Sequence, residues 1–272
     1  MGKFDGVLLV SDLDGTLLTH DKSISPQNRE AIQRFMAEGG SFTYITGRTP
    51  VGCHLIFDQM IPHLPIGCIN GGGIYDPTSK TYLWSLKLDP MAKELVRFVY
   101  SEFPHVGIKL SGFYKAWFYR INPRTEELRI IEKIPYAYAS YEEVADQIAK
   151  VVFVTEAEQL EEFATALQGH PLAEMFDFVQ SSAYYYEILP KGSSKGALLH
   201  RMADMFGIDR KKTVAVGDNN NDISMLQNAA YGVAVANATS LAKEAADLVL
   251  EHTNEENAIA ELIERLEQRL PF

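Results

Sequence analysis

Short apolar segments alternate with amphipathic segments at both ends of the chain, and this alternation limits the fold more than any other feature of the sequence. Residues 7–10, 42–45 and 66–69 are apolar runs with the length of buried strands. Residues 213–216 and 233–235 repeat the pattern near the C-terminus. Strands that alternate with helices build βαβ units, whose strands are parallel. The two ends of the chain therefore predict an α/β fold with a parallel sheet.

Helix signals separate these strands. Ser25 is followed by Pro26, which pairs an N-cap residue with a proline at the first helical position. Gly39 is expected to end this helix, because glycine adopts the backbone conformation that terminates a helix. Further helices are expected at residues 50–60, 199–206 and 259–266.

The middle of the chain has a different pattern. Between about Tyr82 and Tyr186, apolar and polar residues alternate in runs rich in aromatic side chains, which is typical of an antiparallel sheet. Two amphipathic stripes interrupt these runs and predict helices that pack on the sheet. The expected strands are residues 115–120, 151–154, 176–179 and 184–186, and the helical stripes are residues 92–99 and 160–167.

Two domains follow from this organisation. The parallel core is predicted from residues 1–82 plus 187–272, and an inserted α+β domain, the cap, from residues 83–186. The boundaries are expected to be accurate to within several residues. The Gly71–Gly73 triplet is expected to connect a hairpin, because the spacing of a dinucleotide-binding loop is absent.

Charge limits the possible partners. The 272 residues include 25 Lys and Arg against 36 Asp and Glu, for a net charge of −11. Within residues 83–186, 10 basic residues face 15 acidic ones, so neither part is a basic module. Nucleic acid and anionic membranes bind basic surfaces and are therefore not expected as partners. With no leader-like segment or long apolar run, we expect a cytoplasmic protein; the sequence does not specify its oligomeric state.

Carboxylates follow two of the predicted strands. Asp12 and Asp14 stand in the segment Asp-Leu-Asp-Gly-Thr directly after the first strand, where open α/β sheets bind their ligands. Asp218 and Asp222 follow the strand at residues 213–216. The first segment could be a simple Asp-Gly turn, and the second could be the capped start of a helix. Because both lie at the ends of strands in one sheet, we expect them to form a Mg²⁺ site.

Two further segments can bind an anion. Thr46, Gly47 and Arg48 follow the second strand, and a hydroxyl with a free backbone N–H can hold phosphate oxygens there. Lys191 and Lys195 precede the helix expected at residues 199–206, where a lysine can act as a point charge for phosphate. Each segment taken alone could be an ordinary turn.

These four segments, in this order, resemble the motifs of the haloacid dehalogenase-like superfamily, and in particular its Cof-like phosphatases of subclass IIB. Asp12 to Thr16, Thr46 to Arg48, Lys195, and Gly217 to Asp222 carry the resemblance, which covers essentially the whole chain. It implies a Rossmann-like core with an inserted cap of the C2 type. The motifs show no departure from the phosphatase pattern.

The resemblance also implies roles. Asp12 would be the nucleophile that forms an aspartyl-phosphate, and Asp14 the general acid and base. Mg²⁺ would be held by Asp12, Asp14 through its backbone carbonyl, and Asp218, with Asp222 binding in an outer position or through water. Lys191 would be a surface residue. The residues expected to bind the phosphate are Leu13, Thr46, Gly47, Lys195 and Asn221.

The cap is expected to contact the leaving group. Trp117, Tyr119, Arg120 and Arg124 are candidate contacts, together with the run Tyr184–Tyr186; the structural alternative is that they pack within the sheet. The expected function is a Mg²⁺-dependent phosphatase for small phosphorylated metabolites, with sugar phosphates as the favoured substrate class. A sugar phosphomutase and a non-enzymatic metabolite-binding regulator are the alternatives.

Overall fold

Two units make up the fold in the computed structural model, which describes residues 2–133 and 137–272. The core unit combines the segment that ends at Gly47 with His54–Trp84 and Ser194–Phe272. The inserted unit combines Arg48–Cys53 with Ser85–Ser193. Among the described residues, no helix has both the length and the apolar character that a membrane span requires.

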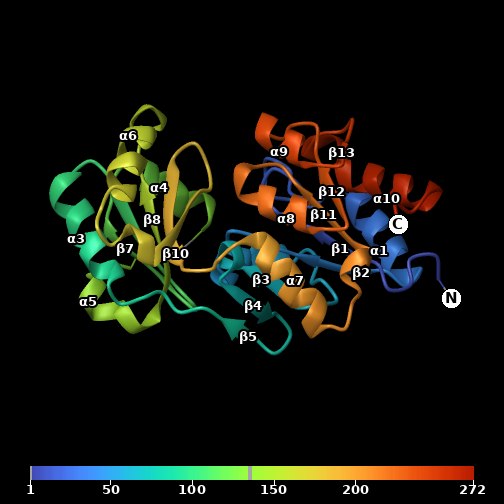
Figure 1. The fold of residues 1–272 in the computed structure, drawn as a ribbon, viewed down its shortest axis with the longest axis horizontal. Helices are drawn as coiled ribbons and strands as arrows, with labels where there is room; N and C mark the ends of the chain where they lie inside the picture. Colours follow the sequence, from blue (N-terminus) through green and yellow to red (C-terminus); the bar gives the residue numbers. More distant parts are fainter. Residues whose placement is uncertain (1, 134–136) are drawn as a thin grey trace. The chain divides into compact units, whose positions relative to one another are not determined.

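The core unit contains a sheet in which every pair of neighbouring strands is parallel, as the sequence predicts. Leu8, Leu9 and Val10 are fully buried, because helices cover both faces of a parallel sheet. Figure 1 shows this sheet between its helices. In spatial order, the strands are β13 (Leu248–Val249), β12 (Tyr231–Ala234), β11 (Thr213–Gly217), β1 (Leu8–Ser11) and β2 (Ser41–Tyr44).

Helices of the core unit follow the sequence signals. Ser25 accepts a hydrogen bond from the Asn28 N–H, and Pro26 is the first helical residue, so the predicted start of the first helix is confirmed. The first and last helices pack together, as do the seventh and eighth. The helices of six residues or more are α1 (Pro26–Ala37), α7 (Lys195–Met205), α8 (Ile223–Asn228), α9 (Ser240–Ala245) and α10 (Ala258–Gln268).

One expectation for the first third of the chain is wrong, and another is confirmed with an addition. The helix expected at residues 50–60 is reduced to a 3-10 turn, η1 (Pro50–Cys53), and a single turn, α2 (His54–Phe57). Gly52 within this segment and Pro62 just beyond it disfavour a longer helix. The expected third strand is present as β3 (Ile66–Cys68): Gly67 forms a parallel bridge with Ile45, directly after β2, and β3 also pairs antiparallel with β4.

A small second sheet in the core unit results from this pairing. The turn η2 (Ile69–Gly71) reverses the chain after β3, and β4 (Gly73–Asp76) returns beside it. The glycine triplet thus connects two antiparallel strands, as expected. The third strand of this sheet, β5 (Thr81–Ser85), is not among the strands that the sequence predicts.

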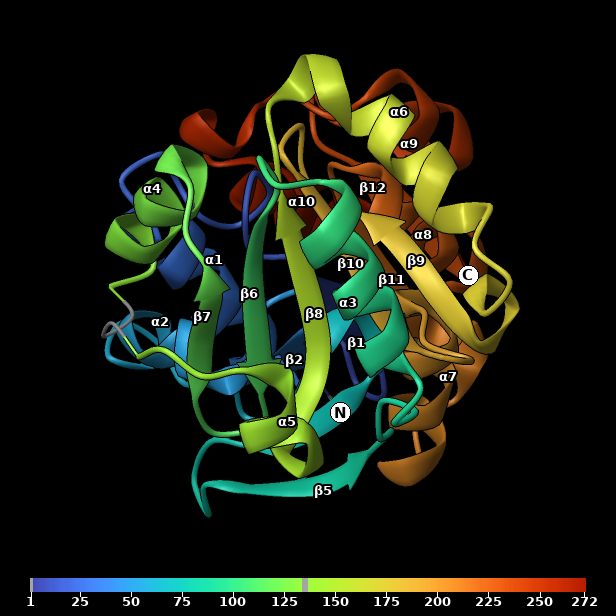
Figure 2. The same cartoon turned by 90° about the vertical axis from the view of Figure 1, so that its left-hand side faces the viewer.

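The inserted unit contains an antiparallel sheet with helices, as Figure 2 shows. Its first strand escapes sequence reasoning because Gly107, Lys109 and Gly112 break the apolar pattern. In spatial order, the strands are β7 (Ala116–Arg120), β6 (Gly107–Gly112), β8 (Ile148–Val154), β10 (Tyr185–Pro190) and β9 (Phe176–Gln180).

The helices of this unit include the two expected ones, α3 (Ala92–Glu102) and α6 (Ala157–Gln168). Two more, α4 (Pro123–Ile131) and α5 (Tyr141–Val144), are not predicted. Asn122 caps α4 with a capping box, a local signal that was available in the sequence.

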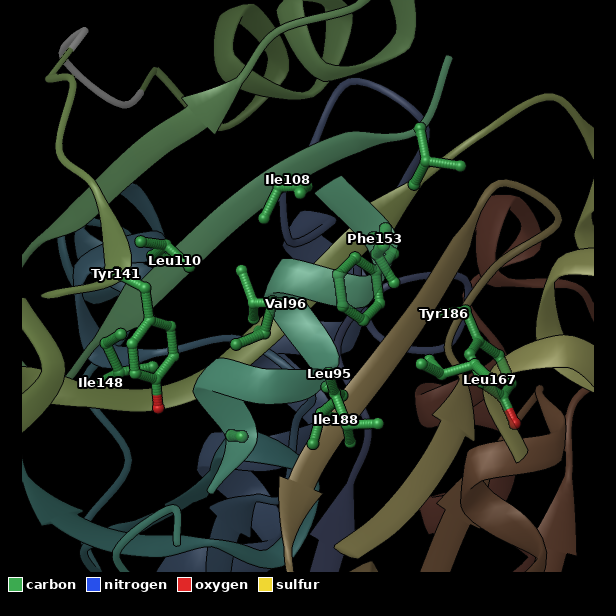
Figure 3. Close-up of a cluster of buried hydrophobic side chains, with 14 of the residues drawn as sticks. Leu95, Val96, Ile108, Leu110, Tyr141, Ile148, Phe153, Leu167, Tyr186 and Ile188 are labelled. Carbon is green, nitrogen blue, oxygen red and sulfur yellow. The ribbon is translucent and has the colours of Figure 1, made fainter. Parts of the chain in front are cut away.

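Aliphatic and aromatic side chains fill the space between the helices and one face of the sheet. Leu95 and Val96 of α3 meet Ile108, Leu110 and Phe153 from the strands, and all five side chains are fully buried (Figure 3). Because side chains alternate along a strand, the residues between these positions lie on the other face.

That other face carries charge. Lys150 and Glu187 form an ion pair of 2.7 Å although both side chains are almost fully buried. Lys109 pairs with Glu132 at 2.5 Å. The charged residue Glu187 interrupts the apolar pattern of β10. The sequence therefore places the end of the insertion at residue 186, four residues before the strand ends at Pro190.

We predict that Phe153→Ala lowers the free energy of unfolding of the inserted unit by about 3–5 kcal/mol, because it leaves a cavity among tightly packed rings. The Phe153 and Phe163 ring centroids lie 5.4 Å apart. Urea titration followed by near-ultraviolet circular dichroism measures the loss. Ile130→Ala, at a side chain that is 59% exposed, is the control and should cost less than about 1 kcal/mol. Equal losses in the two variants would contradict the packing described above.

Candidate active site

Asp12 lies one residue beyond the end of β1. Its backbone N–H donates to the Val216 carbonyl at 2.9 Å, which extends the pairing of β1 with β11. Because the two strands are parallel and in this register, the segments that follow them leave the same edge of the sheet. The carboxylates of Asp12 and Asp218 are therefore neighbours although they are far apart in the sequence.

Lys195 links two of the carboxylates. Its ammonium group donates to Asp12 Oδ1 at 2.6 Å and to Asp222 Oδ1 at 2.5 Å, and its side chain is fully buried. The backbone holds it there because Ser194 caps the start of α7 by accepting from the Ala197 N–H at 3.1 Å. Lys195 thus stands at the first helical position, facing the strand ends.

Asp218 approaches the turn after β1 closely. The Thr16 hydroxyl donates to Asp218 Oδ1 at 2.8 Å. Gly15 has a φ of 80°, and a Cβ atom there would lie 2.5 Å from Asp218 Oδ2. Glycine at this position therefore serves both the left-handed backbone and the close approach of the carboxylate.

Asp222 is held by the turn that contains it. Its Oδ2 accepts from the backbone N–H groups of Asp218 and Asn219 at 3.1 and 3.0 Å, which leaves Oδ1 for Lys195. The residue is fully buried. Asp222 therefore orients both Lys195 and the segment that carries Asp218.

Burial and mutual repulsion dominate the electrostatics of the cluster. Burial raises the pKa of Asp12 well above its usual value, although Lys195 lowers it in part. Burial, followed by repulsion from Asp222, raises the pKa of Asp218 to about 7. Burial alone would lower the pKa of Lys195, but Asp12 and Asp222 outweigh burial and raise it. The carboxylates of the cluster therefore outnumber its one positive charge, the Lys195 ammonium group.

The donor set fits a divalent cation. One carboxylate oxygen from each of Asp12, Asp218 and Asp222 lies within 4.8 Å of the other two. Lys195 pairs with Asp12 and Asp222, and the three carboxylates, when ionised, exceed this one ammonium group by two negative charges. Hard oxygen donors with this excess charge suit Mg²⁺ better than a metal that prefers nitrogen or sulfur ligands.

The residues expected to bind phosphate lie in the same unit. Thr46 is buried, and its backbone N–H donates to the Gly67 carbonyl at 3.1 Å. Asn221 donates through Nδ2 to Asn70 Oδ1 at 3.1 Å, while its own Oδ1 is buried and finds no hydrogen-bond partner within residues 2–133 and 137–272. Leu13 is fully buried, and its carbonyl accepts from the backbone N–H of Leu18 at 2.9 Å.

Asp14 differs from Asp12 in its exposure. Its side chain is 39% exposed, and Lys22 donates to Asp14 Oδ1 at 2.8 Å. A carboxyl group at the rim of a site can exchange protons with solvent and with a leaving group, which a fully buried one cannot do as readily.

Sequence reasoning missed three residues that organise this site. Lys22 contacts Asp14, and Asn70 contacts Asn221. Asn237 donates to the Gly15 carbonyl at 2.8 Å and so holds the turn after β1. The only local signals were an asparagine before the glycine triplet and one after the strand at residues 233–235.

Residues of the inserted unit that were expected to contact substrate have contacts within that unit. Trp117 belongs to the hydrophobic cluster of that unit, and Tyr119 packs against the cluster. Arg120 donates to the carbonyls of Phe103 and Val106 at 2.7 and 3.3 Å. Arg124 binds Glu156 at 2.9 Å and lies over the Tyr184 ring. A role in substrate contact stays a prediction for all four.

Lys191 and Lys195 occupy different environments. The Lys191 side chain is 62% exposed and pairs with Asp177 at 3.1 Å, whereas Lys195 is enclosed by carboxylates. Of the two lysines before the helix, the second is therefore the one that can serve the site.

Comparison with known proteins agrees with this geometry. The haloacid dehalogenase-like hydrolase family model matches residues 9–263. A putative phosphatase from Haemophilus influenzae is 28% identical over 93% of this chain and 95% of its own length. The pyridoxal phosphate phosphatase YbhA of Escherichia coli is 30% identical over 94% of this chain and 97% of its own length.

Among solved structures, the haloacid dehalogenase subclass IIB sugar phosphatase BT4131 has the same fold. Its TM-score is 0.83 at 20% identity, and the alignment covers 96% of this chain and 99% of that one. The family match spans both units, and the acidic cluster at the ends of β1 and β11 lies within it. The chain belongs to the haloacid dehalogenase-like hydrolases, and it is a phosphoric monoester hydrolase of their Cof-like group.

Proposed function

We propose that this protein is a Mg²⁺-dependent phosphatase that hydrolyses small phosphorylated metabolites through an aspartyl-phosphate on Asp12. Sugar phosphates are the favoured substrate class. The observation that carries the proposal is the buried Asp12 carboxylate, bonded to Lys195 and grouped with Asp218 and Asp222. Two carboxylates next to a nucleophilic carboxylate would only repel a phosphate, unless a cation joins them.

In the first step, an oxygen of Asp12 attacks phosphorus, and the bond between phosphorus and the leaving oxygen breaks. Asp14 donates a proton to that oxygen, so the dephosphorylated part of the substrate leaves as an alcohol. Lys195, which already donates to Asp12, offsets the repulsion between the carboxylate and the phosphate. Asp12, Asp218 and the Asp14 carbonyl would hold Mg²⁺, and Asp222 would lie in an outer position or bind it through water. The ion would supply further positive charge to the site.

In the second step, water attacks the phosphorus of the aspartyl-phosphate. Asp14, now ionised, takes the proton from this water, and the bond between phosphorus and the Asp12 oxygen breaks. Inorganic phosphate is released, and the Asp12 carboxylate is regenerated. Thr46, Gly47, Asn221 and the Leu13 N–H are proposed to hold the phosphate oxygens during both steps. An acyl phosphate hydrolyses more easily than an alkyl phosphate, so the covalent route divides one difficult step into two easier ones.

The choice of metabolite rests on the inserted unit, with Trp117, Tyr119, Arg120 and Arg124 as the proposed contacts. By their names, one relative acts on pyridoxal phosphate and one structural neighbour on a sugar phosphate. A panel of both substrate classes, with p-nitrophenyl phosphate as the generic substrate, tests the proposal. Release of inorganic phosphate from a hexose phosphate supports hydrolysis, whereas isomer interconversion without release identifies a mutase.

We predict that Asp12→Asn lowers kcat for p-nitrophenyl phosphate by at least about a thousandfold, because the nucleophile is lost. The fold should remain intact, since the amide keeps the size of the carboxyl group and removes a buried charge. Phosphate release and circular dichroism measure the two effects. An Asp12→Asn variant with wild-type turnover would refute the covalent mechanism.

Lysine variants provide a matched pair. Lys195→Met should lower kcat/KM by about a hundredfold or more, because a positive charge beside the transferring oxygens is lost. It should also lower the free energy of unfolding by about 3–5 kcal/mol, since Asp12 and Asp222 lose their buried partner. Lys191→Met, at a 62% exposed side chain, should change neither property appreciably. The assignment of Lys195 fails if the two variants behave alike.

Removal of metal gives a further test. Enzyme treated with EDTA should lose activity, and added Mg²⁺ should restore it. At a concentration one hundred times its Kd, Mg²⁺ should stabilise the fold by about 2.7 kcal/mol, seen as a rise in Tm. Asp218→Asn should abolish this rise, since it removes a proposed ligand. Undiminished turnover without metal would contradict the Mg²⁺ requirement.

A further inference from the structure

The turn η2 (Ile69–Gly71) holds two adjacent residues in left-handed backbone conformations. Ile69 has a φ of 60° and Asn70 a φ of 50°. Positive φ is uncommon for any residue other than glycine, and for a β-branched residue it is an outlier. Such conformations persist where surrounding contacts over-determine them, and they gather at functional sites.

Asn70 contacts two of the segments proposed to bind phosphate. Its backbone N–H donates to the Thr46 carbonyl at 3.1 Å, and its Oδ1 accepts from Asn221 Nδ2 at 3.1 Å. A Cβ atom on Gly47 would lie 2.9 Å from Asn70 Oδ1, so the side chain rests against the Thr46–Gly47 turn. Asn70 is 2% exposed, so these contacts occur out of solvent.

Gly71 brings the same turn to a third segment. Its φ is 108°, and a Cβ atom there would overlap the backbone of Ser194. Ser194 caps α7, whose first residue is Lys195. The turn therefore lies against the segments that carry Thr46, Asn221 and Lys195, all within the core unit.

Asn221 is oriented by this arrangement. Its amide nitrogen has two N–H groups, and the bond to Asn70 uses one of them. Its Oδ1 is buried and has no hydrogen-bond partner among the described residues. The second N–H of this amide can donate to a phosphate oxygen, whereas the unpartnered Oδ1 is an acceptor and suits a donor such as water or a cation.

We propose that Asn70 is a positioning residue for the phosphoryl group. It holds the Asn221 amide and the Thr46–Gly47 turn in the arrangement that binds the transferring oxygens, and it acts through Asn221 rather than on the reacting atoms. This inference rests on the proposed function. Because the phosphoryl group is common to every substrate, the loss of Asn70 should affect all leaving groups equally.

Asn70→Gly is the most direct test, because glycine adopts a φ of 50° freely and keeps the N–H that donates to Thr46. Only the side chain is lost. The inhibition constant for inorganic phosphate should rise about tenfold, and kcat/KM should fall about tenfold for p-nitrophenyl phosphate and for an alkyl phosphate alike. Unchanged phosphate inhibition, or a loss confined to one leaving group, would overturn the proposal.

Asn28→Ala is the matched control. Asn28 is also fully buried in the core unit, and its Oδ1 accepts from the Ala260 N–H at 2.9 Å, away from the acidic cluster. The control should lower Tm yet leave phosphate inhibition within about twofold of the wild type. If destabilisation alone weakened phosphate binding, both variants would show it, and the positioning role would be excluded.

A double-mutant cycle tests the route of action. If Asn70 acts partly through Asn221, Asn70→Gly should weaken phosphate inhibition less on the Asn221→Ala background than in the wild type, because the contact between the two residues is already lost there. Fully multiplicative effects would show that the two residues act independently, which contradicts the proposal.

A second variant keeps the test decisive if glycine unfolds the turn. Asn70→Asp has the same shape and tolerates the left-handed conformation, but it places a negative charge against the Thr46–Gly47 turn. Inhibition by phosphate should then weaken at least about tenfold; an unchanged constant would refute the inference. Failure of the proposed function is seen separately, as a wild-type enzyme that releases phosphate from no phosphomonoester.

Discussion

The buried ammonium group of Lys195 is the interaction on which the rest of the site depends. It joins Asp12 and Asp222, which are separated from it by 183 and 27 residues. Burying three charged groups is unfavourable unless each one is paired and hydrogen-bonded. The cap on α7, the left-handed Gly15 and the turn around Asp222 all bring these groups together at the ends of β1 and β11.

The cluster remains short of positive charge even with Lys195 in place. Burial and repulsion raise the pKa values of Asp12 and Asp218, which means that the folded chain disfavours their ionised forms. Such an arrangement lowers the stability of the isolated protein and favours the binding of a cation. The carboxylates that destabilise the folded protein are thus the groups proposed to bind a metal ion and, through it, a phosphate dianion beside the nucleophilic carboxylate.

The sequence could predict Asp12 and Asp218 because both follow apolar strands, and parallel strands must end at one edge of a sheet. It could not predict Asn70 as easily. The apolar run before Asn70 predicts the strand β3 and its parallel neighbour, but it does not reveal that β3 also pairs antiparallel with β4 through the turn that carries Asn70. The contact of Asn70 with Asn221 spans 151 residues and requires two residues with positive φ, and no periodic pattern encodes such a turn.

In the inserted unit, the length of β10 could not be predicted for a similar reason. Glu187 interrupts its apolar pattern, and the partner that allows this charge to be buried, Lys150, is remote in sequence.

The most direct test of the proposed mechanism is to detect the aspartyl-phosphate on Asp12. Enzyme mixed with a phosphomonoester and Mg²⁺ is quenched in acid within the first turnovers, digested, and mapped by mass spectrometry. A covalent mechanism on Asp12 predicts the added mass of a phosphoryl group on the peptide that contains Asp12, and its absence in Asp12→Asn. A phosphoryl group on another residue, or rapid phosphate release with the Asp12 peptide unmodified at every quench time, would contradict it.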